Sequence, residues 1–547
     1  MSLLRTWSFG AVLTALAVAP PVRAQEHEAH LHGLGRLGRV SFPVSCTPEA
    51  QRRFQHAMAV LHSFWWEEGD AAFNAVLAAD STCAMAHWGI ALNAWGNPFA
   101  GGPTGPTLTH GAQAATRASA LPARTPRERG FIAAVAALYR DAESTPNAAR
   151  LQAYADTMAR LYRDYTRDVE VAIYHALALV ATAPRTDTTF AQHRRAIGIL
   201  EPLFARHPEH PGLAHYVIHA TDSPPLARLG LAAARRYARI APAAPHAQHM
   251  PSHIFVRLGL WDETVASNRK SYQAGLDYAA AAGLPAATPH ELHALDYAVY
   301  GYLQRGQDSA ARAAVATARP IDPTDTRASI SAYNRTAMEA RIPLERGDWA
   351  AAAKLAPPAD TVAPIAAALR HFTRAIGSAR SGRAEAARIE IAALDSLAAT
   401  LDARQESYWA RVVRIKRDAA DAWTRLAEGD TAAALALAHL AAETEEVTDK
   451  HPVTPAELVP ARELEADMLL ALGRHTQARE AYQATLAREP GRARSIFGAA
   501  RAAELAGDQT AAAAGYRDFL RLMAKAAPGR AEIAVARAFG KAGGVDR

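Results

Sequence analysis

Histidine side chains gather in one part of this chain, at spacings that suit a metal site. The protein has 22 histidines, and nine of them fall between residues 207 and 293. Seven of the nine form three groups with helical spacing: His215 and His219; His246, His249 and His253; His290 and His293. Residues three or four apart share one face of a helix, so each group aims its imidazoles in one direction.

Nearby carboxylates could complete a set of transition-metal ligands together with these histidines. Asp222 and Asp296 lie close to the histidines in sequence, and no cysteine does. Imidazole with carboxylate binds zinc, copper, nickel or non-haem iron, so a divalent transition metal is the cofactor that this set predicts. The predicted metal ligands are His215, His219, His246, His249, His253, His290, His293 and Asp296.

A structural interpretation of the same residues stands beside the metal site. A single helical histidine is more often paired with a backbone carbonyl or a carboxylate than bound to a metal. Glu291 in HELH is the capping partner of Thr288, and the histidines of HELH are too close together for the zinc-protease motif. We assign no catalytic residue. The predicted ligand-binding residues are Tyr216, Asp222, Tyr297 and Trp88.

Pro251 lies inside the second histidine group, and the sequence allows two helix starts there. If the helix begins near Pro245, Pro251 removes an internal hydrogen bond, a strain of about 3 kcal/mol that would suggest function. If the helix begins near Met250, Pro251 takes the first helical position and no strain arises.

The elements that must position these residues show a repeat. Near the C-terminus, Gly473 and Gly507, Ala478 and Ala512, and Tyr482 and Tyr516 are pairs 34 residues apart, and Pro490 closes the first unit. This is the spacing of the tetratricopeptide repeat superfamily, which the segment resembles. The first helices of such repeats line a concave surface, so we expect the three histidine groups to converge on one groove.

Helix signals continue upstream with longer repeats. Turn glycines are followed closely by Asp or Trp at Gly259, Gly306, Gly347, Gly382, Gly429 and Gly473. Thr-Pro pairs mark helix starts at Thr47, Thr125, Thr288 and Thr454, and Glu128, Glu291 and Glu457 complete capping boxes at the last three. With abundant alanine and no alternating β-branched run, the chain is predicted to be all-α from about residue 47 to 540.

Four segments resemble a known group of proteins. LHSFWWEE (61–68), CAMAHWGIAL (83–92), HYVIHATD (215–222) and HMPSHIF (249–255) are similar to segments of large exported bacterial tetratricopeptide repeat proteins of unassigned function. The resemblance implies an α-α solenoid, a right-handed superhelix of helical hairpins, and export. For tetratricopeptide proteins in general it implies a peptide or protein partner in the concave groove. It supplies no reaction.

Composition and the N-terminal residues limit the partners and the cellular location that we expect for this protein. The chain has 547 residues, half of them apolar, and a net charge of +6 with no run of like charges, which excludes a nucleic-acid partner. Residues 1–24 are a predicted signal peptide, cleaved after Ala24, so the expected location is periplasmic or secreted. We expect no transmembrane segment in the mature chain.

The predicted organisation has five parts. They are the signal peptide (1–24), an extended segment bearing His and Gly (25–45), degenerate hairpins with the aromatic and histidine clusters (46–320), further degenerate hairpins (321–450) and regular repeats (451–547). A Gly/Pro-rich insertion at 97–124 either lies over a pocket or is a mobile surface loop. Trp88 belongs to a helix-spaced aromatic group that suits packing or a groove wall.

Cys46 and Cys83 are the two cysteines of the chain. In an exported protein they predict one disulfide, and two buried thiols are the alternative. Packed helices lie about 8–10 Å apart and a disulfide needs Cα atoms within about 7 Å, so the bridge requires a loop adjustment.

Three functions are compatible with these observations. The first is an exported tetratricopeptide-type binding protein that holds a peptide, a protein partner or a small ligand in its groove. The second is a metal-dependent, hydrolase-like enzyme in which the histidines and aspartates hold an ion that activates water. The third is a structural envelope scaffold whose histidines are core residues.

Overall fold

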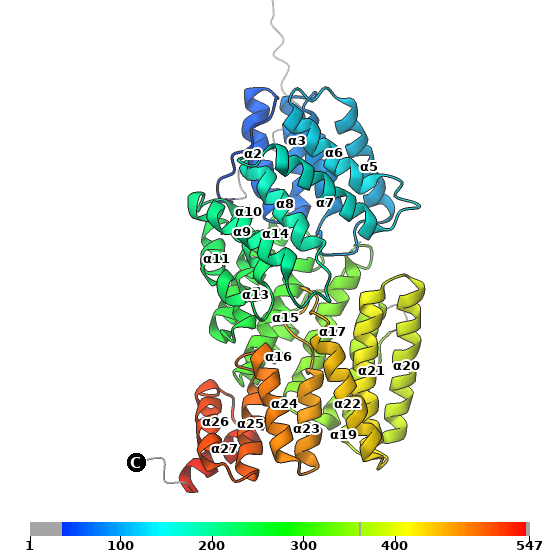
Figure 1. The fold of residues 1–547 in the computed structure, drawn as a ribbon, viewed down its shortest axis with the longest axis vertical. Helices are drawn as coiled ribbons and strands as arrows, with labels where there is room; N and C mark the ends of the chain where they lie inside the picture. The colour runs from blue at the N-terminus through cyan, green and yellow to red at the C-terminus, as the bar shows by residue number, and fades with distance from the viewer. Residues whose placement is uncertain (1–34, 326, 360–362, 543–547) are drawn as a thin grey trace, which may run out of the picture. The chain divides into compact units, whose positions relative to one another are not determined.

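The computed structural model describes residues 35–325, 327–359 and 363–542. Within these ranges the regular elements are α-helices, and no strand occurs. Successive helices pack on each other as hairpins, which confirms the predicted all-α, tetratricopeptide-like solenoid (Figure 1). Residues 1–24, the predicted signal peptide, and residues 25–34 lie outside the described ranges.

The first half of the chain carries the aromatic and histidine clusters. Most helices here pack mainly against their neighbours in sequence, whereas α12 packs chiefly on α14, and α13 packs on α11 and α14. α10 also touches α2, α8 and α13. The bounds are α2 Pro48–His62, α3 Trp66–Ala79, α4 Ala84–Trp95, α5 Gly105–Ala120, α6 Pro126–Tyr139, α7 Asn147–Asp164, α8 Val169–Ala181, α9 Ala191–Arg206, α10 Pro211–Thr221, α11 Ala227–Ile240, α12 Pro245–His249, α13 Pro251–Arg257, α14 Trp261–Ala281 and α15 Pro289–Gln304.

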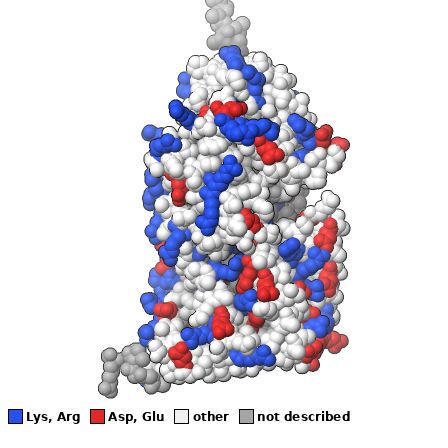
Figure 2. Space-filling view, viewed as in Figure 1, with Lys and Arg blue, Asp and Glu red and all other residues white. Residues whose placement is uncertain are grey.

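The second half continues as hairpins in the same compact unit, which begins at Arg36. Its bounds are α16 Asp308–Ala316, α17 Ala328–Glu345, α18 Trp349–Ala353, α19 Pro364–Arg380, α20 Ala384–Ala403, α21 Ser407–Ala427, α22 Thr431–Glu446, α23 Ala461–Ala471, α24 His475–Arg488, α25 Ala493–Leu505, α26 Gln509–Leu522 and α27 Ala531–Ala542. On the face in Figure 2 both signs of charge are interspersed, in keeping with the diffuse charge of the sequence.

Local signals in the sequence place most turns and helix starts. The predicted turn glycines all have positive φ, which side-chain-bearing residues rarely adopt. Thr47 caps α2, and Thr125 and Thr288 form the predicted capping boxes of α6 and α15. In the C-terminal repeats, a Cβ at Gly498 would lie 2.3 Å from the ring of Tyr482, so the aromatic fills a gap that only glycine leaves.

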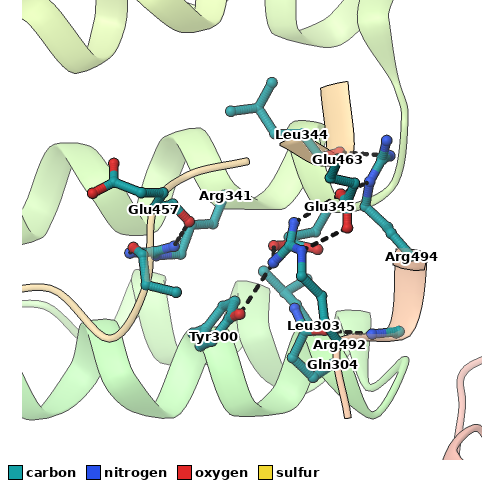
Figure 3. A network of polar contacts seen from close by, with 12 residues as sticks. Tyr300, Leu303, Gln304, Arg341, Leu344, Glu345, Glu457, Glu463, Arg492 and Arg494 are labelled. Carbon is teal, nitrogen blue, oxygen red and sulfur yellow. Dashed lines mark hydrogen bonds and ion pairs between the residues drawn. The ribbon is translucent and has the colours of Figure 1, made fainter. Parts of the chain in front are cut away.

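The predicted helix start at Thr454 is wrong. Residues 449–460 are irregular and α23 begins only at Ala461. The buried Arg341 of α17 donates to the carbonyl of Glu457 at 3.1 Å (Figure 3). It also donates to the Thr454 hydroxyl and the Ala456 carbonyl, each at 2.8 Å, so these groups are not available for the hydrogen bonds of a helix. The carboxylate of Glu457 pairs with Lys416 instead of closing a capping box.

The insertion at 97–124 also differs from the expected loop. Residues 105–120 form α5, preceded by Thr104 and with proline in the first turn, so only a short irregular stretch follows α4. Alanine-rich composition after the Gly/Pro cluster accounts for the helix.

A disulfide joins Cys46 and Cys83, with Cα atoms 5.3 Å apart. Neither cysteine lies in the interior of a helix: Cys46 precedes α2, and Cys83 is the N-cap of α4. Because neither cysteine lies inside a helix, the disulfide forms without bringing two packed helices closer together than usual.

Buried ion pairs dock the C-terminal repeats against α15 and α17. Arg492 is fully buried and bonds Glu463 of α23, Glu345 of α17 and the hydroxyl of Tyr300 at 2.7–3.0 Å (Figure 3). The segment between α22 and α23 lies against the histidine-bearing helices, because the hydroxyl of Tyr297 in α15 bonds the carbonyls of residues 452 and 454 and Lys450 lies 3.5 Å from Asp222.

Candidate metal centre

Four helices bring the predicted histidines together. His215 and His219 come from α10, His246 and His249 from α12, and His253 from α13. α15 supplies the last member, His293. Every residue of α10 is buried because other helices pack around it, so its two histidines point into protein on whichever face they lie.

Six of these histidines form two triads. Triad A is His215, His219 and His246, and triad B is His249, His253 and His293. Within each triad the candidate ligand atoms all lie within 4.8 Å of one another. Five of the six residues are buried and His293 is partly exposed.

The rings converge through their Nε2 atoms. In triad A, the Nε2 atoms of His219 and His246 each lie 3.1 Å from Nε2 of His215. In triad B, the Nε2 atoms of His249 and His253 are 2.9 Å apart. Such separations suit an N–H···N hydrogen bond, and they are also close to those of nitrogen atoms that share one small cation, so the positions of the ring hydrogens decide between the two.

The two triads are neighbours. The ring centroids of His219 and His253 are 6.2 Å apart, and those of His246 and His249 are 6.1 Å apart. The helix break at Met250 and Pro251 lies between them: one short helix begins at Pro245 and a second begins with Pro251 in its first turn. Both helix starts that the sequence allowed are therefore present.

Hydrogen bonds to the opposite ring nitrogens orient the ligands. Nδ1 of His215 donates to the backbone carbonyl of His62 at 2.7 Å, and Nδ1 of His253 donates to the Asp222 carboxylate at 2.8 Å. A carbonyl and an ionised carboxylate only accept, so both imidazoles carry their hydrogen on Nδ1. Each therefore turns an Nε2 lone pair into its triad, the arrangement typical of metal-bound histidine.

His249 is held in the same way. Its Nδ1 lies 2.6 Å from Oδ1 of Asn268, and Nδ2 of Asn268 donates to the carbonyl of Thr264 at 2.7 Å. That second bond orients the amide, so Oδ1 is the acceptor and Nδ1 of His249 is the donor. In triad B the Nε2 lone pairs of His249 and His253 consequently face each other.

Burial and mutual repulsion keep the triads neutral. Burial lowers the pKa of His215 to about 3. For His219, His246, His249 and His293, burial and neighbouring imidazoles lower the pKa well below its usual value. The unprotonated imidazole is the form that binds a metal ion.

Asp222 acts beside triad B and not inside it. Although burial opposes ionisation, Lys450 and Arg257 hold the pKa of Asp222 well below its usual range. Nε of Arg257 lies 2.9 Å from Oδ1, and Nζ of Lys450 lies 3.5 Å from Oδ2. The carboxylate we predicted as ligand-binding is thus the hydrogen-bond acceptor of His253.

Two predicted metal ligands lie outside both triads. Asp296 is fully buried in an ion pair with Arg341, whose Nε is 2.9 Å from Oδ1. His290 packs 5.5 Å from the ring of His246 and lies 3.5 Å from the carboxylate of Glu67. The partner of Asp296 comes from a distant helix, which sequence spacing does not reveal.

The predicted ligand-binding aromatics have three different surroundings. Tyr297 packs on the rings of triad B, 4.7 Å from His249, and its hydroxyl donates toward the carbonyls of residues 452 and 454 at 3.1 Å. The hydroxyl of Tyr216 lies 3.1 Å from Nδ1 of His62. Trp88 lies in an aromatic core with Phe131, 5.5 Å away, and is a packing residue.

The histidines do not line an open groove. The segment 447–460 covers them through the contacts of Tyr297 and Asp222, and Phe99 from the stretch after α4 packs 4.4 Å from the ring of His219. Histidines from all three predicted groups therefore meet, but they meet inside packed protein and not in an open groove.

Sequence reasoning missed a third group, formed by His62, Glu170 and His210. Both imidazoles donate through Nε2 to the Glu170 carboxylate at 3.0 Å. Nδ1 of His62 accepts from Tyr216, and Nδ1 of His210 accepts from the amide of Leu213. Every ring nitrogen has a partner of the right polarity, so this group is a satisfied structural network.

Comparisons with known proteins add no family. No protein-family model matches this chain, and no curated protein matches it. Among solved structures, a human IFIT1 dimer with m7Gppp-AAAA matches at 12% identity and a TM-score of 0.33, over 76% of this chain and 86% of that chain. A circular tandem repeat protein matches at 12% identity and a TM-score of 0.12, over 91% and 99%. At these TM-scores the matches carry no functional argument.

None of the described helices combines the length and the apolar character needed to cross a membrane.

Proposed function

We propose that this protein binds two transition-metal ions, one in triad A and one in triad B. The observation that carries the proposal is the pair of Nε2 atoms of His249 and His253, 2.9 Å apart, with both Nδ1 atoms already committed as donors. Two facing lone pairs repel each other, and a cation between them replaces the repulsion with two bonds.

A proton is the competing cation. Burial and the neighbouring rings of His293 and His253 lower the pKa of His249 well below its usual value, which disfavours the proton near neutral pH. A metal ion accepts neutral imidazoles directly, so it satisfies the triad without charging a buried ring.

The donor set favours zinc, copper, nickel or iron. Each triad offers three imidazoles, while the nearest carboxylate, that of Asp222, is occupied by His253, Arg257 and Lys450. Imidazole suits these four metals, whereas magnesium and calcium require oxygen ligands.

In this proposal the solenoid is a scaffold that holds the ions. A protein or peptide partner would bind elsewhere on the helical surface, since the six ligands are covered by the segment 447–460 and by Phe99. Export to the periplasm or the medium is proposed on residues 1–24 alone.

A metal-dependent enzyme is the second candidate, and one observation favours it. Three protein ligands leave a fourth position of a tetrahedral ion open, as in catalytic zinc sites, whereas structural zinc sites use four. An ion with an open position lowers the pKa of bound water or polarises a substrate carbonyl.

Metal analysis of the purified full chain tests the proposal. After growth in metal-replete medium, we expect two transition-metal ions per chain by inductively coupled plasma mass spectrometry. His219→Ala removes a ligand of triad A and His253→Ala one of triad B, so each variant should retain about one ion.

The matched control is His439→Ala. His439 is half exposed, bonds Glu465 and belongs to neither triad, so this variant should retain both ions. A wild-type chain that carries no stoichiometric metal, and whose melting temperature does not respond to added zinc or copper, would falsify the proposal and leave the structural scaffold.

A further inference from the structure

A cavity of about 30 Å³ lies next to triad A. Its walls come from α2, α3 and the turn between them, from α4 and the stretch after it, and from α6, α7, α8 and α10. They are almost entirely leucine, alanine and aromatic side chains. Among the lining residues are Phe64, Pro98, Tyr174, Leu177, Ala181 and Tyr216.

Two aromatic side chains, Phe64 and Tyr216, separate the cavity from the candidate metal site. Phe64 lines the cavity, and its ring centroid lies 4.4 Å from that of His215 and 5.5 Å from that of His246. Tyr216 also lines the cavity and packs 5.0 Å from His215. The cavity and triad A therefore share a wall one aromatic ring thick.

The backbone at Phe64 is unusual. Its φ is +50°, in the left-handed region that a phenylalanine rarely adopts, and the residue is almost fully buried. Such a conformation is energetically unfavourable for a phenylalanine and persists only where the surroundings require the side chain there. Here it places the phenyl ring between the cavity and the histidines.

The mouth of the cavity lies at the short stretch after α4. Gly96 and Pro98 line it and are partly exposed, as is Ala181 at the end of α8. The next residue in the stretch, Phe99, packs on His219 of triad A. The same few residues thus border both the entrance of the cavity and the histidines.

Water is a poor occupant of this space. A buried water needs two to four polar partners. The hydroxyl of Tyr216 is already bonded to His62, and the buried hydroxyl of Tyr174 has no partner among the described residues. Nearly all of the remaining lining surface is apolar, although Tyr154, Trp66 and Trp95 also contribute to it. A cavity with apolar walls stays dry and takes up apolar molecules that fit its size.

We propose that this cavity binds a small uncharged apolar molecule of two or three heavy atoms, the class that includes dioxygen, and presents it to triad A across Phe64. The inference rests on the proposed function for its relation to the metal, but the binding itself is independent of metal. Copper and iron, two of the metals that suit the triads, are the ones whose chemistry uses such molecules.

Xenon, an apolar atom of similar size, is the probe. Crystals of the full-length zinc-loaded protein under xenon pressure should show one xenon site in the cavity. Leu177→Trp fills the cavity and should abolish that site, and Ala181→Phe blocks its mouth at a partly exposed position if the first variant folds poorly. Leu505→Trp, a change at an exposed leucine of α25, is the control that should keep xenon.

The variant Phe64→Ala tests whether this side chain lies between the cavity and triad A. In Phe64→Ala the xenon density should extend toward His215. Absence of xenon from the wild-type cavity, or a Phe64→Ala cavity that grows in another direction, overturns this inference. Metal content measured on the same samples reports separately on the proposed function, because neither Leu177 nor Ala181 belongs to a triad.

Discussion

At the scale of single residues, hydrogen-bond partners distinguish a metal ligand from a structural histidine. The Glu170 group (His62, Glu170 and His210) and triad B both bring imidazoles within hydrogen-bonding distance of other buried polar groups. In the Glu170 group each ring nitrogen meets a group of opposite polarity. In triad B, by contrast, the Nε2 atoms of His249 and His253 are both acceptors and face each other. Both rings carry their hydrogen on Nδ1 and donate it to Asn268 and Asp222. The positions of protons therefore carry information that proximity alone does not.

Asn268→Leu tests this distinction at one residue. The variant removes the acceptor that orients His249, and loss of such a partner typically weakens metal affinity by about 10- to 100-fold. We expect zinc titration to show one weakened site and one normal site. Asn93→Leu, the same change at a buried asparagine that bonds Asp70 and not a histidine, is the matched control. Equal zinc affinity in Asn268→Leu and wild type would remove the role assigned to Asn268.

At the scale of elements, periodicity predicts a helix better than it predicts where the helix stops. The turn glycines and the capping boxes of α6 and α15 depend on neighbouring residues, so the sequence alone predicts them. The segment near Thr454 carries the same capping signal and is irregular, because Arg341 from another helix binds its carbonyls. A buried guanidinium outweighs a local cap worth about 1 kcal/mol.

The break between α12 and α13 leads to a prediction about these elements. Pro251 cannot donate a backbone hydrogen bond, so Pro251→Ala restores a donor and favours one continuous helix. The apoprotein should melt at the same or a higher temperature, while the metal affinity of triad B falls because His253 turns with the straightened helix. Calorimetric melting and zinc titration measure the two effects. Pro245→Ala, at the start of α12, should change neither; loss of affinity in both variants would argue against the break.

At the scale of the whole molecule, many buried neutral histidines make stability depend on pH. The pKa of His215 is lowered to about 3 by burial, and those of His219, His246 and His249 are lowered as well. The unfolded chain takes up protons below a pKa of about 6.5 that the folded chain refuses. The stability that these groups contribute is complete above that pH and is lost as the pH falls.

We therefore expect the melting temperature of the apoprotein to fall steeply between pH 7 and pH 5. Each imidazole that stays neutral in the folded state lowers the free energy of unfolding by about 1.4 kcal/mol per pH unit below 6.5. His249→Gln/His253→Gln should show a shallower fall, because two such groups are gone. Differential scanning calorimetry across this range gives the slope, and a flat profile in the wild type contradicts the neutral state of the triads.

The sequence by itself predicts most helices from local composition and capping residues, most turns from glycines, and the groups of histidines that share a helix face from spacings of three or four. The packing of distant helices settles the rest: which rings meet, that Asp296 pairs with Arg341, and that Asn268, Asp222 and the carbonyl of His62 orient the lone pairs. A hydrogen bond forms with whichever suitable group packs nearest. Because most of these partners lie on other helices, spacing along the chain does not reveal them.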